Sequence, residues 1–244
     1  MLFEKPSICP CWILSHPRSG SLLLCNLLNN TNLFRPKFQE WFAIDTTHPQ
    51  GYWPALQNIP CEDRYSRVMQ EEFPPYCKIH KWQYDQFFTN RQKPKIEQKL
   101  PGIKYIQLKR RDHIACAVSM YLAHITGICH SDNLTHYQMI VPEVPIDDKM
   151  LLKCYEIAIN YYSHWDEYLG NSKVLVIHYE EFCQNPASTL VDVINYLDIP
   201  CNVVALAENS VKQNKLVKLA NKQTEELKDR LRILISTSSD MLDA

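Results

Sequence analysis

Two short segments of the sequence each place arginine beside hydroxyl-bearing residues at the expected start of a helix. In the first, Arg18 precedes Ser19, Gly20 and Ser21, and leucines at helical spacing follow. Free backbone N–H groups and the positive end of a helix dipole attract anions. A guanidinium group adds a charged, forked donor. The segment therefore predicts a phosphate or sulfate site, with a serine-capped surface helix as the alternative.

The second segment follows the apolar run that begins at Lys104. It contains Arg110, Arg111 and Asp112, and Ser119 lies about two helical turns further on. Asp112 is suited to cap a helix. Two arginines at the end of a strand suit a polyanion bound without a metal, because a Mg²⁺-dependent nucleotide hydrolase needs an aspartate there. The G-K-[ST] end of the usual phosphate loop is also missing after Gly20. A small-molecule kinase is therefore disfavoured, although it stays an alternative.

A candidate general base lies between these segments. Glu40 is flanked by Phe38, Trp41 and Phe42, and apolar surroundings raise the pKa of a carboxyl group toward values useful for proton abstraction. The alternative is an ordinary solvated glutamate. Further along, the turn-rich segment 45–75 carries aromatic residues that could stack on an acceptor ring or simply pack on each other.

The chemistry-bearing residues need a scaffold, and the hydrophobic pattern predicts an α/β fold. Strands expected near 12–15, 76–80, 104–109 and 174–178 alternate with helices. This alternation predicts a central parallel sheet flanked by helices, in the style of phosphate-loop folds, as a single domain over 1–244. Ligands bind beyond the carboxyl ends of strands in such sheets, so we expect the two arginine-bearing turns to converge there.

Two apolar patterns later in the chain predict further elements. The continuous apolar run within 173–180 is typical of a parallel strand buried on both faces. A helix expected over 147–169 has an aromatic stripe, which indicates core packing or a homodimer face.

Composition narrows the classes of partner. The formal net charge is −1, so no global field would recruit nucleic acid. The ten cysteines lack metal-ligand spacing, which favours core thiols over zinc. No apolar run is long enough to cross a membrane and no basic, apolar leader opens the chain, so we expect a reducing, cytoplasmic setting.

The order P-R-S-G-S-x-L-L over 17–24 resembles the 5′-phosphosulfate loop of sulfotransferases that use 3′-phosphoadenosine 5′-phosphosulfate (PAPS), especially the bacterial trehalose 2-sulfotransferase family. The Q-E-aromatic-Phe order at 39–42, the A-V-S order at 117–119 and the V-x-x-Y-E order at 176–180 are similar to segments of the same family. The last of these has a mainly architectural role there. Leu22 stands where the family often has threonine, and Pro36 lies further from Gln39 than in the family.

The resemblance implies a metal-free transfer of the sulfuryl group from PAPS to a hydroxyl of a small, sugar-containing acceptor, leaving adenosine 3′,5′-bisphosphate (PAP). Glu40 is implied to take the hydroxyl proton, and Arg18 to stabilise the departing phosphate oxygen. The residues implied to bind PAPS are Arg18, Ser19, Gly20, Ser21, Leu22, Leu23, Arg110, Arg111, Ser119 and Lys218. Those implied to line the acceptor pocket are Lys37, Gln39, Trp41, Phe42, Trp53, Lys78 and His80.

Two questions stay open at this point. Arg111 lies eight residues before Ser119 and Arg110 nine, and both spacings suit the grip on the 3′-phosphate. The departures at Leu22 and Pro36 also leave a catalytically silent nucleotide-binding effector as an alternative function.

Overall fold

A computed structural model of the chain describes residues 11–33, 79–83, 102–127, 146–214 and 222–240. The strands are β1 (Cys11–Ser15), β2 (Ile79–Gln83), β3 (Lys104–Lys109) and β4 (Val174–His178). The helices are α1 (Ser21–Asn30), α5 (His113–Thr126), α7 (Asp148–Leu169), α8 (Tyr179–Gln184), α9 (Pro186–Tyr196), α10 (Val203–Gln213) and α11 (Lys222–Asp240).

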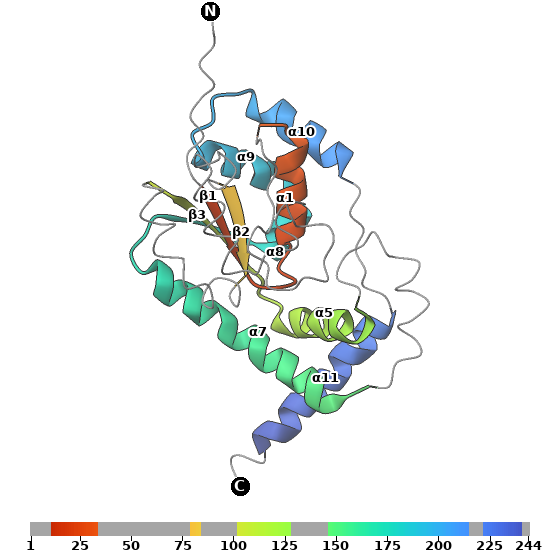
Figure 1. Ribbon diagram of the computed structural model, residues 1–244. Helices are drawn as coiled ribbons and strands as arrows, with labels where there is room; N and C mark the ends of the chain where they lie inside the picture. Colours follow the sequence, from red (N-terminus) through yellow and green to blue (C-terminus); the bar gives the residue numbers. More distant parts are fainter. Residues whose placement is uncertain (1–10, 34–78, 84–101, 128–145, 215–221, 241–244) are drawn as a thin grey trace, which may run out of the picture.

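The strands form one parallel sheet in the order β2-β1-β3-β4 (Figure 1). The register pairs Ser15 at the end of β1 with Leu108 of β3, and Lys109 at the end of β3 with His178 of β4. The carboxyl ends of these strands therefore lie along one edge. This confirms the predicted α/β fold with a parallel sheet flanked by helices, while the extent of a single domain over 1–244 stays a prediction.

Strand β1 is buried on both faces of the sheet. Because successive side chains of a strand point to opposite faces, Cys11 and Ile13 lie on one side and Trp12 and Leu14 on the other, and all four are fully buried. This pattern is typical of an inner parallel strand covered by helices on both faces.

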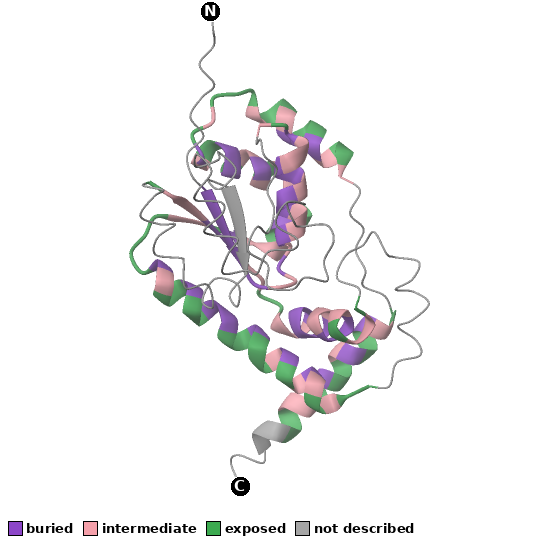
Figure 2. Ribbon diagram, in the orientation of Figure 1, coloured by how far each residue is buried: buried purple, intermediate pink, exposed green. Residues whose placement is uncertain are grey.

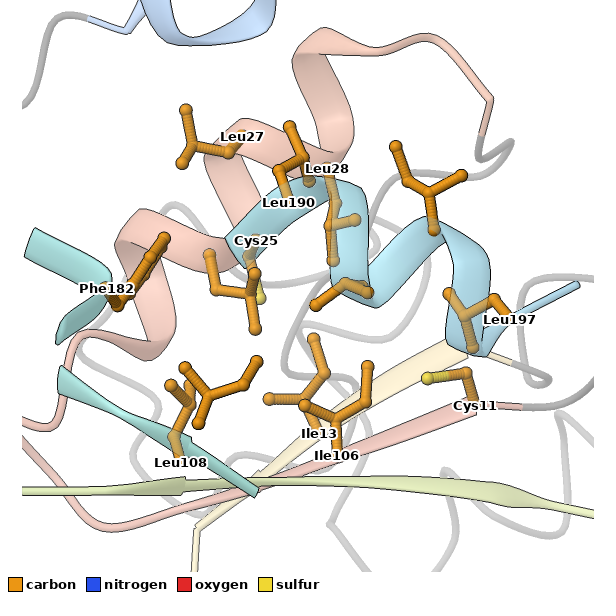
Figure 3. Close-up of a cluster of buried hydrophobic side chains, with 14 of the residues drawn as sticks. Cys11, Ile13, Cys25, Leu27, Leu28, Ile106, Leu108, Phe182, Leu190 and Leu197 are labelled. Atoms are coloured by element: carbon orange, nitrogen blue, oxygen red, sulfur yellow. The ribbon is translucent and has the colours of Figure 1, made fainter. Parts of the chain in front are cut away.

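The first hydrophobic cluster lies between the sheet and the helices α1, α8 and α9 (Figure 3). It is almost wholly aliphatic, apart from Phe182 and buried thiols. The residues labelled in Figure 3 are Cys11, Ile13, Cys25, Leu27, Leu28, Ile106, Leu108, Phe182, Leu190 and Leu197. Helix α10 packs on α9 and α1 and contributes Ala207.

The opposite face of the sheet is covered by α7, through aromatic and polar side chains. Tyr105 of β3 makes edge-on ring contacts with Trp12 and Tyr168. Gln107 donates to Asp166 Oδ1 at 2.8 Å.

Beyond the sheet, the other half of α7 packs with α5 and α11 in a second hydrophobic cluster that includes Leu151, Cys154, Ala158, Leu227 and Leu231 (Figure 2).

Two strand predictions need correction. β2 extends to Gln83, beyond the strand expected near 76–80, and residues 76–78 lie outside the described residues. The strand expected within 173–180 is present as β4, but it is not buried on both faces, because Val176 is 44% exposed. β4 is the last strand in the described sheet order. On the face where Val176 lies, α7 contacts β1 and β3, and Val176 on β4 stays exposed.

The cap predicted at Asp112 is confirmed. The Asp112 side chain accepts from the Ala115 amide at 2.7 Å and caps α5, and Asp147 caps α7 in the same way. None of the six cysteines within the described ranges forms a disulfide bond. None of the described helices is both long and apolar enough to cross a membrane.

Candidate anion-binding site

The first arginine-bearing turn connects β1 to α1 and spans His16 to Gly20. It is closed by the His16 carbonyl, which accepts from the Ser19 amide at 3.2 Å and from the Ser19 hydroxyl at 2.7 Å. Arg18 and Gly20 both have left-handed backbones, with φ of 69° and 88°. The turn is therefore a fixed structure whose serine hydroxyl is already used internally.

Gly20 is required at its position for two reasons. Its φ of 88° is unfavourable for a residue with a side chain. A Cβ atom at this position would also lie only 2.5 Å from Cδ2 of Tyr179. Tyr179, the first residue of α8, thus packs directly against the turn.

The floor of the first turn is formed by uncharged buried groups. His16 is fully buried against the rings of Tyr161 and Tyr162, with centroids 4.2 Å and 5.5 Å away. Its Nδ1 contacts the Pro17 carbonyl and lies 3.4 Å from Cys116 Sγ. Burial lowers the pKa of His16 to about 4 and raises the pKa of the Cys116 thiol to about 12. Both groups are neutral at neutral pH, so they support the turn rather than supply a charged acid or nucleophile.

The second arginine-bearing turn connects β3 to α5, and Arg110 points from it toward the first turn. Arg110 Nη1 donates to the Arg18 carbonyl at 2.9 Å. Its guanidinium carbon lies 4.6 Å from the centroid of the Tyr179 ring, within the range of a cation–π contact. The Arg110 amide donates to the Tyr162 hydroxyl at 2.8 Å, and burial raises the pKa of that hydroxyl above its usual range.

Arg111 and Asp112 of the same turn are matched by two glutamates of α8. The Arg111 and Asp112 amides both donate to Glu180 Oε1 at 3.1 Å. Partial burial alone would raise the pKa of Glu180, but these amides and the Arg110 charge hold it below its usual range. Arg111 Nη1 forms an ion pair with Glu181 Oε1 at 2.7 Å, and both side chains are more than half exposed.

A direct hydrogen bond joins the two turns. Arg18 Nε donates to the Ser119 hydroxyl of α5 at 2.9 Å. Together with the contact of Arg110 to the Arg18 carbonyl, this bond brings residues about a hundred positions apart into one site. The predicted convergence of the turns at the carboxyl edge of the sheet is therefore confirmed. The starts of α1, α5 and α8 meet at this edge (Figure 1).

The first turn of α1 offers additional donors. No residue in the described part of the chain accepts a hydrogen bond from the amides of Ser21, Leu22 or Leu23, as expected of the first residues of a helix. Ser21 is buried, while Leu22 and Leu23 are half-buried. These amides, the guanidinium groups and the Ser119 hydroxyl make a donor set suited to phosphate or sulfate oxygens.

Several predicted site residues lie outside the described residues, and their roles stay predictions. These are Lys37, Gln39, Glu40, Trp41, Phe42, Trp53, Lys78 and Lys218. His80 belongs to β2, where the register pairs its backbone with Trp12, three residues before the strand ends at Gln83. The side chain of His80 is not among those described.

No group of three or more His, Cys, Asp and Glu side chains is arranged to hold an ion in the part of the chain that the structure describes. The metal-free reaction inferred from the sequence nevertheless stays a prediction.

One described cavity lies away from the arginine-bearing turns. It has a volume of about 470 Å³ and lies at the amino ends of β3 and β4, lined in part by Lys104, Lys173, Asn195 and Asp198. Lys104 already pairs with Asp198 at 2.5 Å and donates to the Tyr196 carbonyl. The chemistry of the donors therefore favours the turns over the cavity as the anion site.

Tyr179 and Glu180 were missed as site residues, although the sequence carried a signal for them. They come directly after β4, so they must lie at the same carboxyl edge as the arginines. Tyr179 packs against Gly20, and its ring contacts the Arg110 guanidinium, at the turn itself.

Known sulfotransferase structures are similar to this one at low sequence identity. The sulfotransferase from Alicyclobacillus acidocaldarius shares 14% identity with a TM-score of 0.48, over 94% of this chain and 92% of that one. The mouse sulfotransferase SULT7A1, solved in complex with PAP, shares 17% identity with a TM-score of 0.45, over 84% of this chain and 66% of that one. The sulfotransferase STF9 from Mycobacterium avium shares 13% identity with a TM-score of 0.47, over 95% of this chain and 77% of that one.

The sequence itself shows the relationship more directly. No curated protein matches the chain. The model of the Sulfotransferase family, in contrast, matches residues 10–202, a range that contains both arginine-bearing turns and every described strand. The chain belongs to the sulfotransferase family.

Proposed function

We propose that the protein transfers the sulfuryl group of PAPS to a hydroxyl of a small, sugar-containing acceptor. The observation that carries the proposal is the contact between the two arginine-bearing turns, through Arg18 and Ser119 and through Arg110 and the Arg18 carbonyl. PAPS carries anionic groups on both its 5′ and 3′ sides, so a site for it needs two donor clusters at one edge of the sheet.

The described residues fit such a molecule. The amides at the start of α1 and the Arg18 guanidinium would hold the 5′ side. Arg110 or Arg111, together with Ser119, would hold the 3′-phosphate, and Lys218 is proposed to assist. None of these interactions needs a metal ion, since the donors are N–H and O–H groups.

PAPS supplies an activated sulfuryl group attached to a phosphate leaving group. Arg18 and the α1 amides would stabilise the negative charge that develops on the phosphate oxygen as the sulfur–oxygen bond breaks. Glu40 would take the proton of the acceptor hydroxyl as its oxygen bonds to sulfur. The acceptor then leaves as a sulfate ester, with PAP as the second product and the proton on Glu40.

The acceptor pocket is proposed from the sequence. Aromatic residues of the segment after α1, namely Trp41, Phe42 and Trp53, would stack on a sugar ring, and Lys37, Gln39, Lys78 and His80 would bind its hydroxyls. Because the Q-E-aromatic-Phe order resembles trehalose 2-sulfotransferases, trehalose is the first acceptor to test. We place the reaction in the cytoplasm, on the unpatterned spacing of the cysteines.

Calorimetry with PAP, and with ATP plus Mg²⁺ in parallel, tests the donor. Tight binding of PAP with weak binding of ATP is the expected result. An acceptor screen with labelled PAPS then tests the reaction. Turnover of ATP that depends on Mg²⁺ would support a small-molecule kinase, and binding of PAP without transfer to any hydroxyl would support a silent effector.

Two variants test the proposed roles in transfer. Arg18→Ala should lower turnover by roughly 10²–10³-fold, the usual loss on removing a donor to a developing anion. Glu40→Gln should lower turnover by about 10²–10⁴-fold and leave PAP affinity nearly unchanged. Normal turnover in the Glu40 variant would remove this residue from the role of base.

A further inference from the structure

We propose that Arg110 is a positioning residue that holds the first turn in shape, and that it does not bind the 3′-phosphate. The inference rests on the proposed function and resolves which of two adjacent arginines meets the nucleotide. Arg111 is then the arginine that acts with Ser119 on the 3′ side.

The first argument is the group that Arg110 contacts. Its Nη1 donates to the carbonyl of Arg18 at 2.9 Å. Arg18 has a φ of 69°, a left-handed backbone that is unfavourable for a residue with a side chain. A charged donor on the carbonyl of that residue stabilises the peptide in this conformation. The same conformation directs Arg18 Nε to Ser119 at 2.9 Å.

The second argument is the packing of Tyr179. The guanidinium of Arg110 lies 4.6 Å from the centre of the Tyr179 ring, and a Cβ atom on Gly20 would come within 2.5 Å of the same ring. Arg110 and the turn therefore share one aromatic platform. Planar stacking combined with a directed N–H is a geometry that arginine provides and lysine does not.

The third argument is accessibility. Arg110 Nε is buried and has no hydrogen-bond partner among the described residues. Arg110 as a whole is half-buried, and its Nη1 is already engaged by the Arg18 carbonyl. The Arg111 side chain is 56% exposed, and its partner Glu181 is 61% exposed. Such an exposed ion pair is weak, so Arg111 can exchange it for a more highly charged anion.

The test compares PAP with adenosine 5′-phosphate, which lacks the 3′-phosphate. If Arg110 positions the first turn, Arg110→Gln should weaken both nucleotides by the same factor, about 10- to 100-fold, the range for losing a hydrogen bond from a charged donor. Arg111→Gln is the matched control and should weaken PAP alone. A loss confined to PAP in the Arg110 variant would overturn the inference.

Three further variants separate positioning from charge. Arg110→Lys keeps the charge and should fail to restore the affinity for either nucleotide. Tyr179→Leu removes the platform and should reproduce the loss for both nucleotides, whereas Tyr179→Phe keeps the ring and should bind like the wild type. Restored affinity in Arg110→Lys would contradict a role that depends on the planar fork.

A readout without nucleotide keeps the inference independent of the proposed function. Hydrogen exchange of the segment 16–24 should be about 10-fold faster in Arg110→Gln and Tyr179→Leu, and unchanged in Arg111→Gln. Exchange in α9 is followed as the measure of global stability. If Arg110→Gln raises the exchange rate in α9 as well, the comparison at the turn is made with Arg110→Lys instead. Unchanged exchange at the turn would overturn the inference. Failure of the wild type to bind either nucleotide would instead overturn the proposed function.

Discussion

The two arginine-bearing turns meet at one site but are held in place by different physical means. The turn of His16 to Gly20 depends on shape: it has two left-handed residues, a fully buried histidine and a glycine in contact with an aromatic ring. The turn of Arg110 to Asp112 depends on charge, because the Arg111 and Asp112 amides and the Arg111 guanidinium are matched by the carboxylates of α8. The first turn should therefore respond to changes of volume and to protonation of its buried histidine, and the second to changes of charge and salt and to protonation of Glu180.

The largest effect is expected from adding a methyl group to the first turn. Gly20→Ala combines a left-handed φ with a Cβ atom 2.5 Å from Tyr179, so it should lower the free energy of unfolding by about 2–5 kcal/mol. Gly127→Ala is the matched control, because it has a φ of 67° and no atom within 4 Å of its Cβ. Urea unfolding of both variants measures the difference. Equal losses would show that the contact with Tyr179 can relax.

Mild acid should destabilise the first turn through His16. The pKa of this residue falls from 6.5 to about 4 on folding because it is buried. The unfolded chain therefore binds a proton at pH values where the folded chain does not, and stability is lost as the pH drops below about 6.5. Between pH 7 and pH 5 this loss should be about 2 kcal/mol, measured by urea unfolding.

His164 supplies the control for this pH dependence. It is an exposed residue of α7, and His164→Gln should leave the slope between pH 7 and pH 5 as it is in the wild type. His16→Gln should flatten the slope. A slope that survives in the His16 variant would assign the acid sensitivity to another group.

The second turn should lose stability at lower pH. The pKa of Glu180 is lowered on folding, so its contribution is complete above the unfolded pKa of about 4.5 and is lost as the pH falls through the lower folded value. Glu180→Gln removes the charge that accepts two amides, and should cost about 1 kcal/mol at pH 7, as for the loss of a helix cap. Thermal unfolding of the wild type and of Glu180→Gln at pH 7 and pH 3.5 checks this, since the difference in stability between the two proteins should become smaller in acid.

The smallest effect is expected at the surface ion pair. Glu181→Gln removes the partner of Arg111 and should change stability by less than about 1 kcal/mol, with a smaller difference in high salt. It should also strengthen binding of PAP slightly, because Arg111 then does not have to give up its ion pair with Glu181 in order to bind the nucleotide. Weaker binding of PAP would show that Glu181 orients Arg111 for the nucleotide.

The sequence was sufficient for the main elements of the fold because their signals are local. Apolar runs marked the strands, and Asp112 and Asp147 marked the starts of α5 and α7. The boundary of β2 and the exposure of Val176 were not predictable in the same way, since register and edge position depend on residues distant in sequence.

The convergence of Arg18 with Ser119 was predictable from the rule that parallel strands place their carboxyl ends together. The proposed difference in role between Arg110 and Arg111 was not predictable from the sequence. Spacing to Ser119 suits both residues, and only the Tyr179 ring and the Arg18 carbonyl distinguish them. Likewise, the fixed role of the Ser19 hydroxyl within its own turn has no signature in the order of residues.

Helix α7 makes the site dependent on a remote part of the chain. Its 22 residues extend over about 33 Å. Near one end, Tyr161 and Tyr162 form the floor under His16, while Leu151 and Cys154 toward the other end pack with α11. Loss of the packing of Leu231 in α11 would therefore destabilise α7, the helix that encloses His16. Damage at the α11 end of the second hydrophobic cluster should therefore lower the cooperativity of unfolding around the arginine-bearing turns.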